Sequence, residues 1–141
     1  MSLLIGWREW LSLPDLGIAR IKAKVDTGAR TSCLHAHRLE PFTERGAPWI
    51  QIWVHPLQRS TQSLCCAAPI VDERVVSDSG GHRERRLVIK TTAILGTEEW
   101  PIEMTLTNRD AMKFRMLLGR SAMADRFTVD PGRSYCCGKL K

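Results

Sequence analysis

The segment Val25-Asp26-Thr27-Gly28-Ala29 places a carboxylate directly after an apolar strand pattern, where it could act as an acid or a base. For that chemistry the carboxylate must leave the end of the strand and point into a cleft. Gly28 lets the chain turn sharply and leaves room beside the carboxylate, because glycine has no Cβ atom. Thr27 offers a hydroxyl that can hydrogen-bond across a symmetric interface. Taken alone, Asp-Thr-Gly is more often a plain turn closed by the aspartate side chain.

A second segment, near the other end of the chain, favours the chemical interpretation of Asp26. Residues 114–120 read Phe-Arg-Met-Leu-Leu-Gly-Arg, and Ser121 can cap a short helix over residues 122–126. Two apolar residues, a glycine and a helix resemble the companion loop that crosses behind the Asp-Thr-Gly turn of aspartic peptidases. The order of the two segments along the chain is also the order found in those enzymes.

Short strands separated by Gly, Pro and Asp turns must position both segments. Ile21, Ala23 and Val25 fall on one face of a strand, and Lys22 and Lys24 fall on the other. Such strands at short spacing predict a barrel or a sandwich. Further β-branched and aromatic runs lie at residues 49–54, 87–95 and 100–107. In the last of these runs, Ile102, Met104 and Leu106 fall on one face of the strand. Glu103, Thr105 and Thr107 fall on the other.

The middle of the chain predicts a hairpin whose tip carries Gly80 and Gly81. These two glycines supply the positive φ angles that a tight reversal requires. The charged residues 82–86 then lead into a long strand. A polar, glycine-rich tip can serve as a mobile lid over a cleft. Local sequence alone favours an ordinary solvated hairpin.

Length and composition predict one soluble domain over residues 1–141. No apolar run approaches the roughly 20 residues of a membrane span. The N-terminus lacks the positively charged first residues of a signal peptide. Five cysteines, two pairs of them adjacent, do not form the pattern of a secreted disulfide framework. We therefore expect a cytoplasmic protein without membrane contact. The net charge of +6 favours acidic partners.

Taken together, these segments resemble retropepsin-like aspartic peptidases. The closer resemblance is to a bacterial family often labelled ATP-dependent zinc protease, which is associated with an ATP-grasp ligase that adds glutamate to a ribosomal protein. The resemblance implies an all-β, closed retropepsin-like barrel with a glycine-tipped flap hairpin and one short helix. The matching segments are residues 6–10, 13–17, 21–32, 105–110, 116–120, 129–131 and 133–135.

The resemblance also implies a mechanism in which Asp26, Thr27 and Gly28 are the catalytic residues. Aspartic peptidases use two carboxylates that share one proton, because both cannot ionise at such a short separation. The ionised carboxylate activates a water molecule and the protonated one polarises the scissile carbonyl. One chain supplies one such carboxylate, so we expect a homodimer with both copies of Asp26 at its two-fold axis. No cofactor is expected.

The expected substrate-binding residues are Ala29, Arg30, Gly80, Gly81 and Arg120. Many retropepsins carry an acid where this chain has Arg30, and that acid pairs with the arginine that is Arg120 here. Two arginines cannot pair, so we expect them to bind a carboxylate-rich peptide through charge-assisted hydrogen bonds. Three hairpin arginines could assist or could instead form ordinary ion pairs with Asp78, Glu84 or Asp125: Arg83, Arg85 and Arg86.

The sequence is also compatible with two other functions. The first is a zinc peptidase, although the chain lacks a His-Glu-x-x-His motif. Its only ligand candidates are Cys33, His35 and His37 on one strand face, which are more often plain buried or surface groups. We therefore predict no metal site. The second is a peptide-binding module that keeps the fold without catalysis.

Three further expectations concern surfaces. The basic residues are scattered along the sequence, so we expect no nucleic-acid binding. Trp49 and Trp53 alternate with apolar residues, and we expect core packing to cover both faces of that strand. Lys24 stands where retropepsins usually have an apolar residue, and it should face away from the barrel interior. The two motifs are further apart than in a minimal retropepsin, and we place the additional residues in region 40–68.

Overall fold

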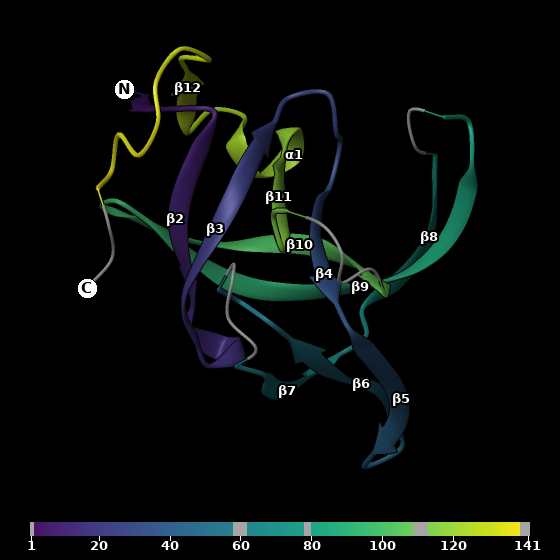
Figure 1. Cartoon of the computed structure of the whole chain (residues 1–141). Helices are drawn as coiled ribbons and strands as arrows, with labels where there is room; N and C mark the ends of the chain where they lie inside the picture. The colour runs from purple at the N-terminus through teal and green to yellow at the C-terminus, as the bar shows by residue number, and fades with distance from the viewer. Residues whose placement is uncertain (1, 58–61, 78–79, 109–112, 139–141) are drawn as a thin grey trace.

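The computed structural model describes residues 2–57, 62–77, 80–108 and 113–138, and it consists mainly of β-strands (Figure 1). The all-β fold predicted from the strand patterns is therefore confirmed. None of the helices in these residues has the length and hydrophobicity that crossing a membrane requires. The elements are β1 (Leu3–Ile5), β2 (Arg8–Leu13), the 3-10 turn η1 (Pro14–Leu16), β3 (Ile18–Asp26), β4 (Ser32–Ala36), β5 (Arg38–Glu44), β6 (Ala47–Val54), β7 (Leu64–Pro69), β8 (Asp72–Ser77), β9 (Arg83–Leu95), β10 (Glu98–Asn108), β11 (Met116–Gly119), α1 (Arg120–Met123) and β12 (Phe127–Val129).

Six strands close into a barrel in the order β10-β4-β11-β3-β2-β9, because β9 also pairs with β10. Each barrel strand therefore has a neighbour on both sides, which removes the exposed edges of an open sheet. In Figure 1, β2 and β3 cross in front of β9 and β10. The strand β8 pairs with the first part of β9 and forms the predicted hairpin, which extends to the right of the barrel in this view.

The alternation of β3 is confirmed, since Ile21, Ala23 and Val25 are buried in the core while Lys24 is exposed. The alternation predicted for β10 is wrong in its second half. Glu103 faces solvent as expected, but Thr105 and Thr107 are buried. In this part β4 pairs with β10 and places Cys33 and His35 beside the two threonines, and both of these side chains contact the Thr107 hydroxyl. Hydrogen bonds to β4 satisfy the two buried hydroxyls, as burial of polar groups requires.

A separate antiparallel sheet, β5-β6-β7, occupies the region in which we placed the additional residues. Its inner face contributes Ile50, Ile52 and Val54 to the same core cluster as the barrel. Its outer face carries Trp49 and Trp53, which are only partly buried. The expectation that the core covers both faces of this strand is therefore wrong.

Neighbouring side chains cover these tryptophans instead of a second layer of core. The ring of Phe42 lies 6.2 Å from that of Trp49, and the Arg38 guanidinium lies 4.6 Å from the Trp53 ring centroid.

The helix α1 begins at Arg120, not after a capping Ser121, and no side chain caps its N-terminus. The first N–H groups of a helix need acceptors outside the helix. Here the N–H groups of Arg120 and Ser121 donate to the carbonyl oxygens of Ala29 and Arg30, at 2.7 and 2.9 Å. The turn that follows Asp26 therefore takes the place of the predicted cap.

The fully buried Glu9 ties the two ends of the chain together. Its carboxylate accepts hydrogen bonds from the N–H groups of Gly6 and Cys136, both at 2.8 Å, and from that of Cys137 at 3.1 Å. The chain ends also approach closely, because a Cβ atom at Gly6 would lie 2.1 Å from the carbonyl oxygen of Arg133. A buried carboxylate with three N–H donors is well satisfied, and losing one acceptor would leave a donor unpaired.

We expect Glu9→Gln to lower the free energy of unfolding by about 1–3 kcal/mol, because an amide NH₂ would then face a backbone N–H. Urea denaturation at one fixed protein concentration measures this change. The matched control is Glu99→Gln, at an exposed carboxylate without a described ion pair, which should change stability by less than about 0.5 kcal/mol. Equal stability of the two variants would contradict the role given to Glu9.

Candidate active site

Asp26 is the last residue of β3, and the following turn fixes its carboxylate. The backbone N–H groups of Gly28 and Ala29 donate to Asp26 Oδ1 at 3.0 and 3.2 Å. A Cβ atom at Gly28 would lie 3.3 Å from that oxygen, which is tighter than ordinary contact. Asp26 is partly exposed, and Thr27 and Gly28 are exposed. Within the described part of the chain, no cation forms an ion pair with this carboxylate.

The strand β11 crosses beside this turn, as the companion-loop pattern predicted. It pairs in parallel with β3, and Gly119 stands opposite Asp26. A Cβ atom at Gly119 would lie 2.5 Å from the Thr31 carbonyl carbon and 2.7 Å from the Ser32 nitrogen, so only glycine fits here without a shift of backbone. The N–H of Gly119 donates to Ser32 Oγ at 2.9 Å.

Nothing in the sequence marks Ser32 or Thr105 as a site residue, yet both support the turn. Ser32 is fully buried, and Thr105 Oγ1 donates to its carbonyl oxygen at 3.2 Å. A single hydroxyl residue gives no pattern from which burial can be predicted. The one available signal is that both residues lie within segments that carry the family resemblance, namely 21–32 and 105–110.

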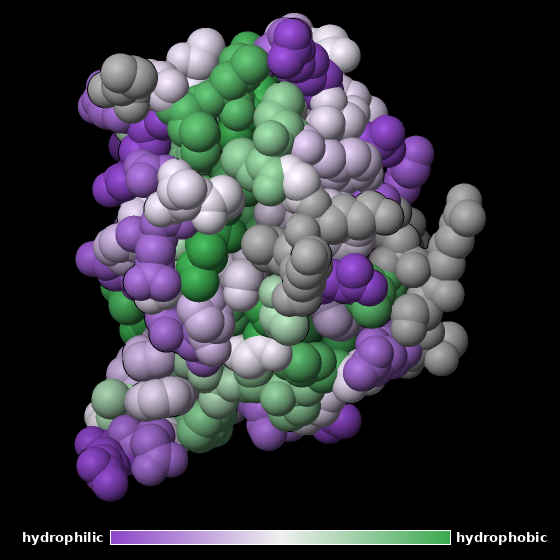
Figure 2. All heavy atoms as spheres, turned by 90° about the vertical axis from the view of Figure 1, so that its left-hand side faces the viewer, coloured by the Kyte–Doolittle hydropathy of each residue, from purple (hydrophilic) through white to green (hydrophobic). Residues whose placement is uncertain are grey.

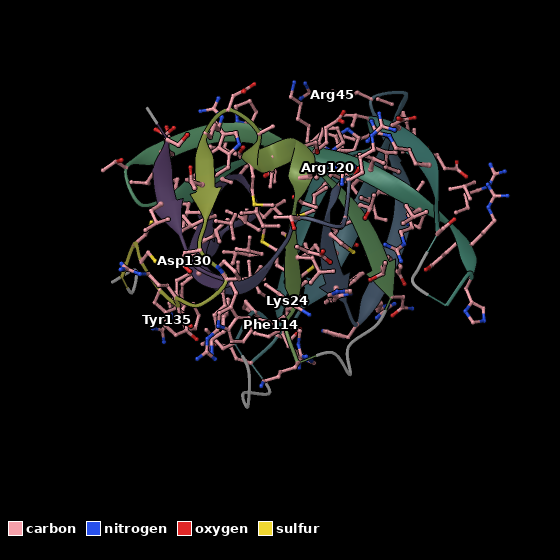
Figure 3. All side chains as sticks on the ribbon, turned by 90° about the horizontal axis from the view of Figure 1, so that it is seen from above. Lys24, Arg45, Phe114, Arg120, Asp130 and Tyr135 are labelled. Carbon is pink, nitrogen blue, oxygen red and sulfur yellow. The ribbon has the colours of Figure 1, made fainter. Side chains whose placement is uncertain are left out.

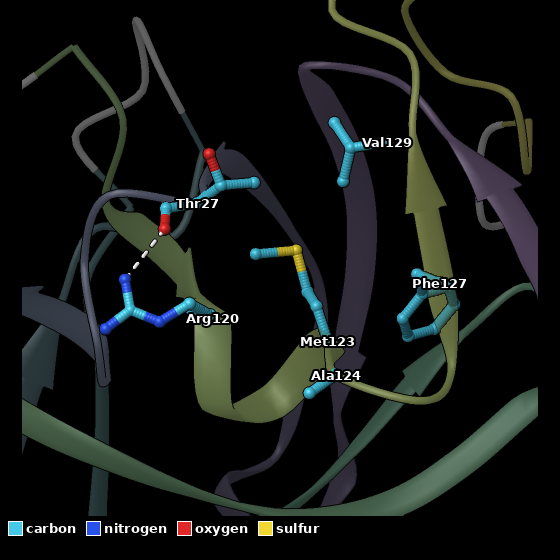
Figure 4. Close-up of a pocket in the computed structure, with 6 residues that line it drawn as sticks. All are labelled: Thr27, Arg120, Met123, Ala124, Phe127 and Val129. Carbon is cyan, nitrogen blue, oxygen red and sulfur yellow. Dashed lines mark hydrogen bonds between the residues drawn. The ribbon is translucent and has the colours of Figure 1, made fainter.

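The structure brings Arg120 to the Asp26 turn but does not pair it with an acid. Arg120 Nη1 donates to the Thr27 carbonyl oxygen at 3.1 Å, drawn as a dashed line in Figure 4. Arg30 is exposed in the same turn. Among the described residues, neither arginine has a carboxylate partner. The departure from the usual acid–arginine pair therefore leaves two cations beside Asp26.

An open pocket of ≈ 330 Å³ adjoins the turn, with mostly apolar walls. It is lined by Thr27, Arg120, Met123, Ala124, Phe127 and Val129 (Figure 4). The neighbouring strand β1, which pairs with β12, presents Leu4 with 39% of its surface exposed. Figure 2 views the molecule from the side of the N-terminus and β12, and a band of hydrophobic residues runs down this face from its top. The pocket therefore places apolar surface next to the Asp26 turn.

Gly80 and Gly81 lie at the end of the β8–β9 hairpin, apart from the Asp26 turn within one chain (Figure 1). Gly81 has a φ of 84°, which confirms that the reversal needs glycine there. Residues 78–79, which include Asp78, lie outside the described residues.

Two of the three hairpin arginines form ion pairs on the hairpin itself. Arg86 pairs with Glu84 at 3.3 Å, as the alternative interpretation proposed, and Arg85 pairs with Glu73 at 3.0 Å. Arg83 has no ion-pair partner in the parts of the hairpin that the structure describes. Only Arg83 is therefore left with an unpaired charge for a ligand.

The three candidate zinc ligands do not come together. Cys33 and His35 both contact Thr107, with His35 Nδ1 at 2.7 Å from its hydroxyl oxygen. His37 lies beyond the end of β4, where it stacks on His55 and hydrogen-bonds Ser63. In the ranges that the structure describes, no three His, Cys, Asp or Glu side chains form a group that could hold a metal ion.

Comparison with known proteins agrees with this geometry. The model of the RimB-like family, described as "Retropepsin-like aspartic endopeptidase RimB", matches residues 4–139. A crystal structure of a protein of unknown function from Legionella pneumophila superposes with a TM-score of 0.80 and 25% identity, over 97% of this chain and 99% of that one.

Longer curated proteins contain a similar segment. Proteins named "Probable alpha-L-glutamate ligase" from Shewanella pealeana and Parasynechococcus marenigrum are 46% and 49% identical over 96% and 99% of this chain. The chain spans only 30% of the length of either relative. With a family match over residues 4–139 and an Asp-Thr-Gly turn at the end of β3, the chain belongs to the RimB-like family of retropepsin-like aspartic endopeptidases.

Proposed function

We propose that this chain is an aspartic peptidase that works as a homodimer, with Asp26 from each copy forming the catalytic pair. The observation that carries the proposal is the half-site itself. One carboxylate stands at an open strand end, held by two backbone N–H groups and backed by the close crossing at Gly119. A second carboxylate is needed for shared-proton chemistry, and two-fold symmetry is the simplest source of it.

The apolar surface beside the turn supports this assembly. A second copy would cover the pocket and the exposed Leu4, and burial of apolar surface stabilises association. Thr27 is exposed at the rim of the pocket, where its hydroxyl could bond to the matching group of the partner. The two catalytic turns would then face each other across the axis.

In the proposed reaction, the ionised Asp26 removes a proton from water while the water oxygen attacks the scissile carbonyl carbon. The protonated Asp26 of the partner subunit donates its proton to the carbonyl oxygen. The tetrahedral intermediate then collapses: the now protonated Asp26 gives its proton to the leaving amine as the C–N bond breaks, and the ionised Asp26 of the partner subunit takes a proton from a hydroxyl of the intermediate. The N–H groups of Gly28 and Ala29 hold the carboxylate in a fixed orientation, so little reorganisation accompanies these steps. The scheme needs no cofactor.

We further propose a glutamate-rich peptide as the substrate. Arg30 and Arg120 lie next to Asp26 without acid partners, and guanidinium groups bind carboxylates with charge-assisted hydrogen bonds. Arg83 could add a third contact when the hairpin approaches the substrate. The relatives named as glutamate ligases contain a segment similar to this chain, which fits a substrate made of glutamate. The five cysteines are free, which fits our placement of the reaction in the reducing cytoplasm.

Asp26→Asn should lower the rate of cleavage of a glutamate-rich peptide by about 10²–10⁴-fold, because the amide can neither accept nor donate the proton. Light scattering should show the same dimer as the native chain. Glu44→Gln, which removes an exposed carboxylate at the end of β5, serves as the control and should keep full activity. Activity retained in Asp26→Asn, or abolished in the native chain by a chelator, would rule out the aspartic mechanism.

Leu4→Asp should convert the dimer to a monomer and remove activity, because it places a charge within the proposed apolar interface. Leu4 is exposed in the single chain, so the circular dichroism spectrum should not change. Val71→Asp, at an equally apolar exposed side chain outside that interface, should remain dimeric. A fully active monomer would contradict the symmetric site.

Arg30→Gln should raise KM for a glutamate-rich peptide about fivefold, which corresponds to one charge-assisted hydrogen bond of about 1 kcal/mol. It should leave KM for a glutamine-rich analogue unchanged. The control is Arg45→Gln, at the exposed β5–β6 turn. If the native enzyme cleaved the glutamate-rich and glutamine-rich peptides at equal rates, the proposed acidic substrate would be wrong.

A further inference from the structure

The outer faces of β2 and β3 gather basic and aromatic side chains that are scattered in the sequence. Arg8 stands opposite Lys24 and Trp10 stands opposite Lys22 in the antiparallel register. The C-terminal segment adds a ring, stacked on Trp10 with a centroid distance of 6.4 Å and an interplanar angle of 22°. We name this surface the basic–aromatic face, and its residues are Arg8, Trp10, Arg20, Lys22, Lys24 and Tyr135.

Cations and rings alternate on the basic–aromatic face. The Arg8 guanidinium lies 4.9 Å from the Tyr135 ring centroid and 4.6 Å from that of Trp7. Lys22 Nζ lies 5.2 Å from the Trp10 centroid and 5.7 Å from that of Tyr135. Arg20 covers Trp10 at 5.3 Å. These cation–π contacts hold flexible basic side chains in fixed places on the sheet.

Three of the four cations of this face have no acid partner among the described residues. Arg8, Arg20 and Lys24 form no ion pair with any carboxylate that the structure describes. The carboxylate of β2, on Glu9, points to the other side of the strand and is buried there. Elsewhere on the molecule several arginines are paired with acids: Arg38, Arg74, Arg85, Arg86, Arg126 and Arg133.

The spacing of the cations suits an extended polyanion. Lys24, Lys22 and Arg20 follow one another at every second position of β3, which puts them about 6.5–7 Å apart along the strand. Arg8 lies beside this row on β2. Figure 3 shows Lys24 and Tyr135 along the same edge of the molecule, with Arg120 set back from it.

We propose that the basic–aromatic face binds a single-stranded nucleic acid. Phosphates would contact the cations, and bases would stack on Tyr135 and on the flat guanidinium of Arg8. An acidic peptide could use the cations but has no group that stacks on the rings, so the composition of the face favours nucleic acid. This departs from the expectation drawn from the sequence, in which these residues are not clustered. It stands independently of the peptidase chemistry at Asp26.

The test is fluorescence anisotropy with a labelled 15-residue oligouridylate and the full chain, over a range of salt concentrations. The triple variant Arg8→Gln/Arg20→Gln/Lys22→Gln should bind at least tenfold more weakly. Its log–log salt slope should fall by about 2, since each phosphate contact contributes about 0.7 for single strands. The matched control, Arg45→Gln/Arg83→Gln/Lys90→Gln, removes the same net charge from exposed positions elsewhere and should bind within twofold of the native chain.

A second pair of measurements separates nucleic acid from other anions. Tyr135→Ala should weaken binding about fivefold or more through lost stacking, and a glutamate 15-mer should compete at least tenfold less well than unlabelled oligouridylate. Equal losses in the two triple variants would overturn the proposal, as would unchanged binding in Tyr135→Ala or equal competition by the peptide. Should the triple variant fail to fold, the exposed single substitution Arg20→Glu replaces it, with Arg45→Glu as its control.

Discussion

The site depends on one close backbone approach, in which Gly119 of β11 lies against the chain between Thr31 and Ser32. Without a Cβ atom there, β11 can pair in parallel with β3 and align its last residue with Asp26. The same approach lets Ser32 accept the Gly119 N–H, and it sets Arg120 beside the Thr27 carbonyl. The position of the carboxylate, the position of the arginine and the start of α1 therefore all follow from a single glycine.

Closure of the barrel determines where chemistry can occur. Each of its six strands uses both edges for pairing, and the interior is filled by side chains such as Ile21, Leu34 and Met104. A ligand therefore cannot enter between strands, and we expect it to bind where a strand ends. The strand β3 ends at the partly exposed Asp26, next to an apolar pocket. The sequence contains one Asp-Thr-Gly segment, which is why the proposed mechanism draws the second carboxylate from another copy.

Features set by neighbouring residues could be predicted from the sequence, while features set by distant pairing could not. The alternation of β3 and the glycine reversal at Gly81 are local, and the structure confirms them. The crossing of β11 beside the Asp26 turn is not local, and it is predicted only through the family resemblance. Burial of Thr105 and Thr107 depends on β4, which is distant in sequence and adjacent only through parallel pairing. The start of α1 depends in the same way on carbonyl groups of the Asp26 turn. The cluster of basic residues on β2 and β3 likewise exists only once their register is fixed.

The replacement of an acid by Arg30 changes what holds the Asp26 turn. An acid–arginine pair weakens when the acid takes up a proton. Here Arg120 instead binds the carbonyl oxygen of Thr27, a group that does not titrate. The turn is also held by N–H groups of α1 that donate to the carbonyls of Ala29 and Arg30. None of these contacts involves a second carboxylate, so the turn is held without the acid–arginine pair. The Arg120 guanidinium, which an acid at position 30 would have paired, therefore has no acid partner among the described residues, and Arg30 adds a second positive charge to the same turn. Both charges are available to an anionic ligand.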